Sequence, residues 1–269
     1  MKALTRVPIF SYNSIATTLL IPTKSLEIKF RKTFLNAETL FELESILAWA
    51  ATHTEIQSLL ITSFGDEFIQ GFDSSELKEL SVDKIIKQFQ KISAIAESLL
   101  CLPQTVVVDM KNGTRGVGLE LVLAADIRIA SSNASFCFDH LSQGLTPSCG
   151  IFSFLKSFIN QNVLRSLLLS GVEFKKESFL ALGGWCEFDC DASAILTNIF
   201  TQAPIARMQA KRGLYGIKQS INHEEVEIEK QIFNATIQSQ DYTKQSDFMS
   251  VAEFKNKNMA YAGSASKGN

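Results

Sequence analysis

Hydrophobic and polar residues change their spacing several times along this chain, and each change marks an expected element. Apolar residues at strand spacing predict two paired strands over Ser14–Leu20 and Ser25–Phe30. Helical spacing predicts helices over Ala37–Ala50 and Val82–Leu100, with a short apolar strand between them over Ser58–Thr62. Strands that alternate with helices in this way are typical of an α/β fold.

A second stretch of this kind lies between residues 103 and 150. The β-branched run Val106–Val108 is typical of a buried strand, and Ile127–Ala130 is expected to form the next one. Between them, Gly116 and Gly118 are expected to keep a turn free of side chains, so that another group can approach the backbone. Glu120–Ala125 then predicts a helix that is buried on most sides.

The loop after the strand at residues 58–62 contains another helix start. Asp73 and Ser74 are both good N-cap residues, and they predict a helix that begins beside them. Backbone N–H groups near Gly71–Asp73 are therefore candidates for a cluster of exposed donors. A simple capped turn is the alternative interpretation.

The composition of the chain changes after Gly184, where helical patterns replace strands. Helices are expected over Ala192–Thr201, from Pro204 onward, over Glu224–Gln240 and over Phe248–Asn258. We therefore expect a strand-containing core over residues 1–200 and a helical region over residues 201–269, ending in a small polar tail.

Composition narrows the class of protein without identifying its activity. The chain has 269 residues, is 46% hydrophobic and carries a formal net charge of −2, which are ordinary values for a soluble globular protein. Lys and Arg are balanced by acidic residues and spread along the chain, which argues against a nucleic-acid partner. No apolar run reaches the roughly 18 residues that span a membrane. No signal peptide is recognised, so a cytoplasmic location is expected.

Cysteine and histidine do not form a metal-binding pattern. The five cysteines are odd in number and lack C-x-x-C spacing, which favours free thiols over disulfides. The three histidines, His53, His140 and His223, are far apart in the sequence. We therefore expect no metal site.

Several short motifs follow one another in a fixed order. Phe68–Asp73 has the form F-x-x-G-x-D, and the run from Asn112-Gly113 to Glu120-Leu121 follows it. The later motifs are Ala124–Ala130, Asn133–Phe136, Gly144–Pro147, Leu168–Gly171 and Ala181–Trp185. This ordered set resembles the central signature of the enoyl-CoA hydratase/isomerase (crotonase) family over most of the chain, whereas no single motif is decisive.

The resemblance implies a crotonase-type α/β fold, which is a spiral of ββα repeats followed by a C-terminal helical trimerisation region. Family members assemble as trimers, often as dimers of trimers, so a homotrimer or hexamer is expected. In that family a basic residue near the C-terminus also reaches a neighbouring CoA site. Lys255 or Lys257 is the candidate for this role, although an exposed helix end explains both residues as well.

The resemblance also implies a site for an acyl-CoA or acyl-pantetheine thioester, with no cofactor other than this substrate. The backbone N–H groups of Phe72 and Val117 align with the two family donors that form the oxyanion hole. Glu120 aligns with a carboxylate that moves a proton, and its alternative is a solvated or capping glutamate. The residues expected to contact the substrate are Gly71, Asp73, Ser74, Ser75 and Gly116.

The chain departs from the family pattern at the second acid/base position. His140 stands where that carboxylate is expected, and Asp139 stands before it in place of a proline. Histidine can exchange protons near neutral pH. Asp139 could hold its imidazole, or a shift of one residue would let Asp139 act instead. The alternative interpretation is that neither residue is catalytic. The Gly-rich turn is one residue shorter than usual and contains Arg115, for which binding of a substrate carboxylate is a hypothesis.

Two functional hypotheses follow. The first is an enzyme that hydrates, isomerises or decarboxylates an acyl-CoA thioester through an enolate, with Glu120 and His140 as catalytic residues. The second is a catalytically silent subunit that binds CoA esters or serves assembly. Dinucleotide binding is disfavoured because Gly113–Gly118 is G-x-x-G-x-G rather than G-x-G-x-x-G. A hydrolase using Ser148 is disfavoured because no nucleophile motif frames that serine.

Overall fold

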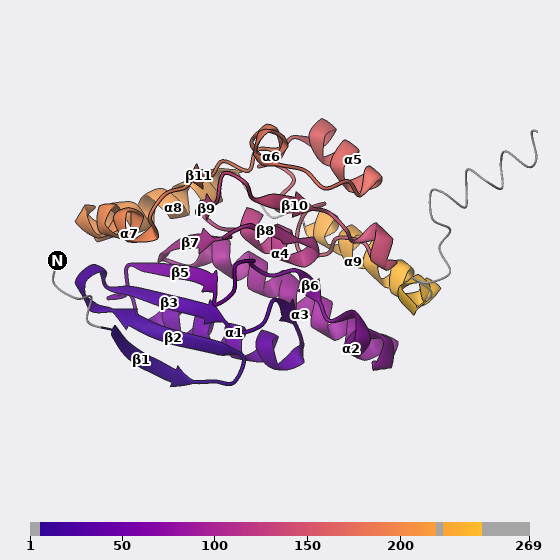
Figure 1. Ribbon diagram of the computed structural model, residues 1–269, viewed down its shortest axis with the longest axis horizontal. Helices are drawn as coiled ribbons and strands as arrows, with labels where there is room; N and C mark the ends of the chain where they lie inside the picture. Colours follow the sequence, from indigo (N-terminus) through magenta and orange to yellow (C-terminus); the bar gives the residue numbers. More distant parts are fainter. Residues whose placement is uncertain (1–5, 219–222, 244–269) are drawn as a thin grey trace, which may run out of the picture.

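The computed structural model describes residues 6–218 and 223–243, and a seven-stranded sheet runs through this part of the chain (Figure 1). In spatial order the strands are β1 (Arg6–Ser11), β2 (Ile15–Leu20), β3 (Ser25–Phe30), β5 (Ser58–Ser63), β7 (Thr105–Asp109), β9 (Ile127–Ala130) and β11 (Glu187–Phe188). The first three strands pair antiparallel, whereas every pairing from β3 to β11 is parallel. The predicted pair of strands before residue 31 is confirmed as β2 and β3, while β1 was not predicted.

The central strands are covered on both faces, as alternating side chains require. Val106 and Val108 of β7 belong to the main core, which also contains buried residues of α1 (Ala37–Thr52) and α3 (Val82–Cys101). Val107 points the other way, into a smaller cluster that includes residues of α7 (Ala192–Thr201). All three helices lie where their apolar spacing predicted them.

Two small parallel sheets hold the loops on which the candidate site is built. In one, β4 (Phe34–Leu35) pairs with β6 (Gly71–Phe72), and in the other, β8 (Gly113–Arg115) pairs with β10 (Ser135–Cys137). Gly113 has φ +141°, and a Cβ at this position would lie 1.9 Å from the carbonyl oxygen of Ser135. Only glycine therefore allows β8 and β10 to pair in this register.

A helix begins directly after each of these loops. α2 (Ser74–Glu79) starts behind its N-cap Asp73, as predicted. α4 spans Gly116–Leu123, so the expectation that Gly116 and Gly118 form a turn outside the helix was wrong. Both glycines belong to its first turn, where a Cβ on Gly118 would lie 2.2 Å from the carbonyl oxygen of Ile69. The missing side chain lets the first turn of α4 pack directly on the 68–73 loop.

The remaining helices complete the structure around this core. They are η1 (Ile21–Thr23), η2 (Leu141–Gln143), α5 (Gln161–Ser170), α6 (Lys176–Leu182), α8 (Pro204–Lys218), α9 (His223–Ser239) and η3 (Asp241–Thr243). α7 and α8 lie at one end of the molecule and α9 lies at the other (Figure 1). α9 packs on α3, with 4.1 Å between the ring centroids of Phe89 and Phe233. The helix expected over Phe248–Asn258, including Lys255 and Lys257, lies outside the described residues.

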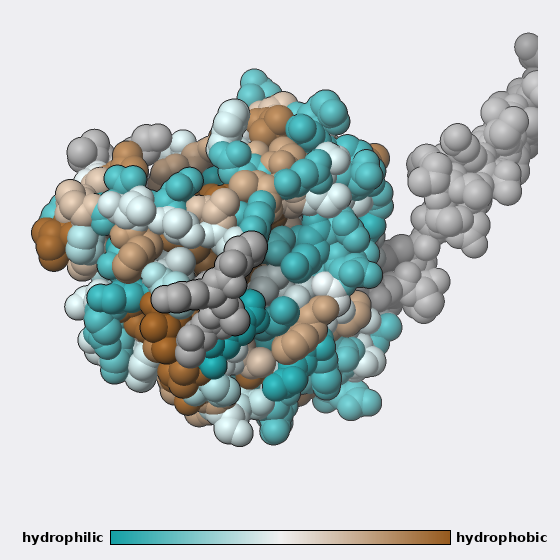
Figure 2. Space-filling model, turned by 60° about the vertical axis from the view of Figure 1, so that its left-hand side comes forward, coloured by the Kyte–Doolittle hydropathy of each residue, from teal (hydrophilic) through white to brown (hydrophobic). Residues whose placement is uncertain are grey.

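The surface is mixed in character, and on the face shown in Figure 2 hydrophobic groups gather mainly toward one side. Of the helices that the structure describes, none has the length and apolar character needed to cross a membrane. All five cysteines are free. Within residues 6–218 and 223–243, no three His, Cys, Asp or Glu side chains are grouped so that they could hold a metal ion.

Candidate functional site

Two buried side chains, Glu120 of α4 and His140 just before η2, form the centre of the site. Nε2 of His140 lies 2.9 Å from Oε1 of Glu120, and their side chains are only 3% and 0% exposed. The same carboxylate accepts backbone N–H bonds from Ser148 at 3.4 Å and Cys149 at 2.9 Å. Glu120 is therefore held by three donors in the protein interior, which rules out the solvated glutamate considered from the sequence.

Only one of the two ring nitrogens of His140 has a hydrogen-bond partner. Nε2 faces Glu120, and one hydrogen bond joins Nε2 to Oε1. Nδ1 is buried and has no hydrogen-bond partner. No hydrogen bond joins His140 to the hydroxyl of Ser148 in the described structure, so the serine hydrolase interpretation gains no support.

A third buried carboxyl group, Glu229 of α9, lies beside this pair. Its Oε1 accepts the N–H of Gly150 at 2.8 Å, and its Oε2 accepts the hydroxyl of Ser153. Burial raises the pKa of Glu229 from the ordinary 4.5 to about 7, while the hydrogen bond from Ser153 opposes this rise. The N–H groups of Ser148 and Cys149 thus bind Glu120, and the next N–H, that of Gly150, binds Glu229.

The two backbone segments proposed as an oxyanion hole lie next to each other. A Cβ placed on Gly116 would lie 3.9 Å from Cα of Gly71, so the first turn of α4 meets strand β6 at this point. The N–H of Val117 belongs to that first turn, which has no acceptor within the helix, and the N-cap Arg115 provides no side-chain acceptor. Phe72 lies in β6 two residues before α2, and both Phe72 and Val117 are buried.

Asp139 approaches the same place from the other side. A Cβ on Gly116 would lie 2.8 Å from Oδ1 of Asp139. Oδ2 of Asp139 accepts a hydrogen bond from Nε2 of Gln143 at 2.9 Å, whereas Oδ1 is buried without a partner. The two neighbouring residues therefore face different groups: His140 is hydrogen-bonded to Glu120, and Asp139 lies beside Gly116 at the start of α4.

The residues expected to contact substrate through their side chains are occupied by local contacts. Asp73 caps α2 by accepting the N–H groups of Ser75 and Glu76 and the hydroxyl of Ser75. These hydrogen bonds lower the pKa of Asp73, and the bond from the Ser75 hydroxyl contributes most. Ser74 is the first residue of α2. The capped turn considered from the sequence is therefore present, and it leaves the neighbouring backbone as the feature of interest.

Arg115 has a protein partner in this structure. Its guanidinium lies 2.6 Å from Oε2 of Glu173, at the surface. A substrate carboxylate would have to compete with Glu173 for this contact.

Sequence reasoning missed a basic pocket beside β6. A cavity of about 340 Å³ is lined by Arg31, Lys32, Thr33, Phe34, Asn36 and Asp73. The pairing of β4 with β6 places it next to the Phe72 segment. Two adjacent cations in a loop are common in sequences, and only the pairing of β4 with β6 shows that this pair lies near Phe72.

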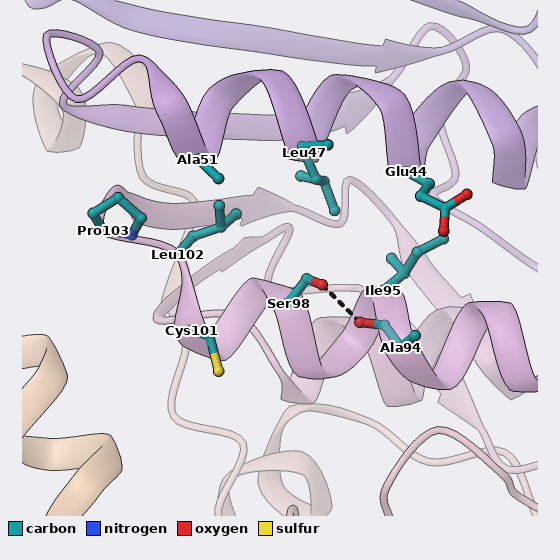
Figure 3. Close-up of a pocket in the computed structure, with 10 residues that line it drawn as sticks. Glu44, Leu47, Ala51, Ala94, Ile95, Ser98, Cys101, Leu102 and Pro103 are labelled. Atoms are coloured by element: carbon teal, nitrogen blue, oxygen red, sulfur yellow. Dashed lines mark hydrogen bonds between the residues drawn. The ribbon is translucent and has the colours of Figure 1, made fainter.

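Two other cavities are not lined by Glu120 or His140. An apolar groove of about 250 Å³ between α1 and α3 has Leu47 and Ile95 in its walls, and its Ser98 hydroxyl donates to the carbonyl of Ala94 (Figure 3). None of the predicted site residues lines that groove. A cavity of about 330 Å³ between α3 and α9 reaches Ser148 and Glu229.

A family model described as enoyl-CoA hydratase/isomerase matches residues 26–262 of this chain. The chain belongs to this family. Among curated relatives, a short-chain-enoyl-CoA hydratase of Clostridium acetobutylicum is 26% identical over 187 residues, which are 67% of this chain and 72% of that protein. The motifs from Phe68 to Trp185 thus belong to an enoyl-CoA hydratase/isomerase sequence, as their order indicated.

Solved structures of the family share the fold. An enoyl-CoA hydratase from Bacillus halodurans superposes with a TM-score of 0.77 at 20% identity, over 88% of this chain and all of that one (100%). An enoyl-CoA hydratase from Mycobacterium avium subsp. paratuberculosis gives a TM-score of 0.77 at 18% identity, over 89% of this chain and 100% of that one. The crotonase fold predicted from the sequence is confirmed.

Proposed function

We propose that this protein is an enzyme of the enoyl-CoA hydratase/isomerase type, which acts on an acyl-CoA thioester through an enolate. One observation carries the proposal: the Phe72 and Val117 segments meet beside a buried acid/base pair. Val117 and Glu120 are three residues apart on α4, so they share one face of the helix. Two relatives are named short-chain-enoyl-CoA hydratase and crotonyl-CoA hydratase, which supports the same substrate class.

In this proposal the thioester oxygen binds between the N–H groups of Phe72 and Val117. Negative charge moves onto that oxygen when the enolate forms, and two fixed N–H donors stabilise it more than they stabilise the neutral carbonyl. The positive end of the α4 dipole points at the same oxygen. Glu120, which is hydrogen-bonded to His140, moves a proton to or from a carbon of the acyl chain.

The pocket at Arg31 and Lys32 supports CoA as the carrier. CoA has a pyrophosphate and a ribose phosphate, which are ligands for clustered cations. Strand pairing joins this pocket to the Phe72 segment, so one substrate could reach both. Acyl-pantetheine on a carrier protein has only one phosphate and is the second candidate.

Turnover assays distinguish the proposed enzyme from a silent subunit. The protein is incubated with 2-enoyl-CoA, 3-enoyl-CoA and malonyl-type thioesters, and each reaction is repeated with Glu120→Gln. We expect turnover of at least one thioester and a fall of about 10²–10⁴-fold in kcat for Glu120→Gln. Binding of every thioester without turnover of any would support the silent subunit instead.

We further propose a homotrimer or a dimer of trimers. Support comes from large apolar side chains exposed in the later part of the described chain, namely Trp185 (69% exposed), Ile205 (67%) and Leu214 (71%). Such side chains mark contacts between subunits when they form a patch. Light scattering coupled to size exclusion would give about three or six times the 29.8 kDa chain mass, and a monomer would contradict the proposal.

A further inference from the structure

Asp139 has a carboxylate oxygen that its surroundings leave unused. Its Oδ2 is held by Gln143 at 2.9 Å, but Oδ1 is buried without a hydrogen-bond partner. A buried acceptor without a donor costs free energy, so native structures retain few of them. Beside a candidate active site, such an atom is a candidate contact for a bound water or substrate.

The position of Oδ1 is fixed by the small sheet of β8 and β10. Cys137 pairs with Arg115, so Asp139 emerges two residues later, opposite the start of α4. Oδ1 then lies 2.8 Å from the place of a Cβ on Gly116, and the same place is 3.9 Å from Cα of Gly71. The oxygen therefore faces the junction of the two segments that carry the proposed oxyanion donors.

Glu120 differs from Asp139 in its surroundings. Three protein donors already hold its carboxylate, and His140 supplies one of them. His140 thereby fixes the orientation of Glu120 from the position where a second acid/base group was expected. Asp139 faces the junction with an oxygen that no protein donor holds.

We propose that Asp139 is the second acid/base carboxylate of this site, and that His140 is a positioning residue for Glu120. The inference rests on the proposed function. Burial raises the pKa of Asp139, while His140, Gln143 and Arg115 lower it. A carboxyl group with a raised pKa is a better proton carrier near neutral pH than an ordinary aspartate.

Two carboxylates allow water to add across the double bond of a 2-enoyl thioester. Asp139 takes a proton from water as the water oxygen bonds to the β-carbon, and the electron pair of the double bond moves to the thioester oxygen. In the form in which both ring nitrogens of His140 carry a proton, the Nε2 proton then passes through Oε1 of Glu120 to the α-carbon, which leaves a neutral imidazole beside the carboxylate. The electron pair returns from the thioester oxygen at the same time. One molecule of water is added, nothing is oxidised or reduced, and proton exchange through solvent restores both groups.

The test separates the two carboxylates by measuring two reactions on the whole protein. Hydration of crotonyl-CoA is followed by the loss of absorbance of the conjugated thioester. Exchange of the α-protons of butyryl-CoA in D₂O is followed by NMR, and this reaction needs no water addition. Asp139→Asn is compared with Glu173→Gln, which removes a neighbouring negative charge that does not face Gly116.

We expect Asp139→Asn to lower the rate of hydration by at least about 10²-fold and to leave α-proton exchange within about threefold of wild type. Glu173→Gln should leave both rates within that range. Asp139→Ala should regain part of its hydration rate when formate is added, which a structural role would not produce. His140→Gln should lower both rates together, because it acts through Glu120.

Hydration by Asp139→Asn within threefold of wild type would overturn the role of Asp139, and so would equal loss of both reactions in a folded variant. If Asp139→Asn does not fold, absence of formate rescue in Asp139→Ala would overturn it as well. A wild-type protein that turns over no acyl thioester would contradict the proposed function itself. The two failures are therefore distinguishable.

Discussion

His140 is hydrogen-bonded to Glu120, with 2.9 Å between Nε2 and Oε1, and the two side chains are only 3% and 0% exposed. His140 stands where the second carboxylate was expected, and it binds the first carboxylate, Glu120. This relationship connects the stability of the core with the chemistry proposed for it.

The first prediction concerns the buried pair. His140→Leu leaves the Glu120 carboxylate buried with one donor fewer, and we expect the free energy of unfolding to fall by about 3 kcal/mol. His140→Gln, whose amide can still donate to Oε1, should lose clearly less. Urea denaturation of both variants measures the difference. Equal losses would mean that the hydrogen bond does not stabilise the fold.

The second prediction tests the backbone donor at Val117. Val117→Pro removes the N–H, and proline is tolerated in the first turn of a helix because that N–H has no helical acceptor. We expect kcat to fall by about 10²–10³-fold. Val117→Ala keeps the N–H and should retain most of the activity. Thermal unfolding of the two variants shows whether any loss comes from the fold, and a fully active, folded Val117→Pro would remove Val117 from the oxyanion hole.

The third prediction concerns the carrier of the acyl group. The double variant Arg31→Ala and Lys32→Ala should raise KM for an acyl-CoA about tenfold, which corresponds to about 1.4 kcal/mol of binding. KM for the same acyl group on pantetheine without phosphates should not change. Lys84→Ala, which removes an exposed lysine outside this pocket, is the matched control. An equal rise for both substrates would contradict phosphate recognition by Arg31 and Lys32.

The fourth prediction concerns the pH dependence of stability. Glu229 has a pKa of about 7 in the folded chain against an ordinary 4.5, so the folded protein binds more protons than the unfolded one between these values. Its contribution to stability is complete below about pH 4.5 and is lost as the pH rises through about 7. The loss is on the order of 3 kcal/mol, from 1.36 kcal/mol per pH unit.

Comparison with Glu229→Gln isolates this contribution. Unfolding free energies of wild type and variant are measured from pH 5 to pH 8, and groups other than Glu229 cancel in the difference. The stability of wild type should fall relative to the variant as the pH rises. A difference that stays constant, or that changes in the opposite direction, would show that Glu229 does not titrate in this range.

The fifth prediction concerns the contact between α4 and the 68–73 loop. In Gly118→Ala the new methyl group would lie 2.2 Å from the carbonyl oxygen of Ile69. Neither backbone can move without disturbing the site, so we expect a loss of about 3 kcal/mol in unfolding free energy. Gly65→Ala, where nothing lies within 4 Å, should be neutral or slightly stabilising. Calorimetry on both variants checks the contrast.

The sequence predicted the longer elements because their patterns extend over enough residues. α3 carries an apolar stripe along 20 residues, and β5 and β7 are continuous apolar runs, so their positions follow from local spacing alone. β8 and β10 have three residues each and no alternation. They form because Gly113 lets two distant segments meet, which local patterns cannot reveal.

The residues of the candidate site also differ in whether a local sequence pattern could identify them. The motif spacing identified Glu120, Phe72 and Val117 as candidates, since all three lie in contiguous family motifs. Glu229 reaches Gly150 across 79 positions of the chain, and no local pattern marks it. His140 and Asp139 were both identified as candidates, but only the three-dimensional structure shows that they face different neighbours.

The shared loop from Ser148 to Gly150 has a consequence for protein engineering. Its N–H groups bind Glu120 from the middle of the chain and Glu229 from α9, so the two parts of the chain cannot be exchanged independently. A chimera that takes its C-terminal helices from a relative needs a hydrogen-bond acceptor where Glu229 stands. Without one, the N–H of Gly150 loses its partner, and the loop that orients Glu120 is held from one side only.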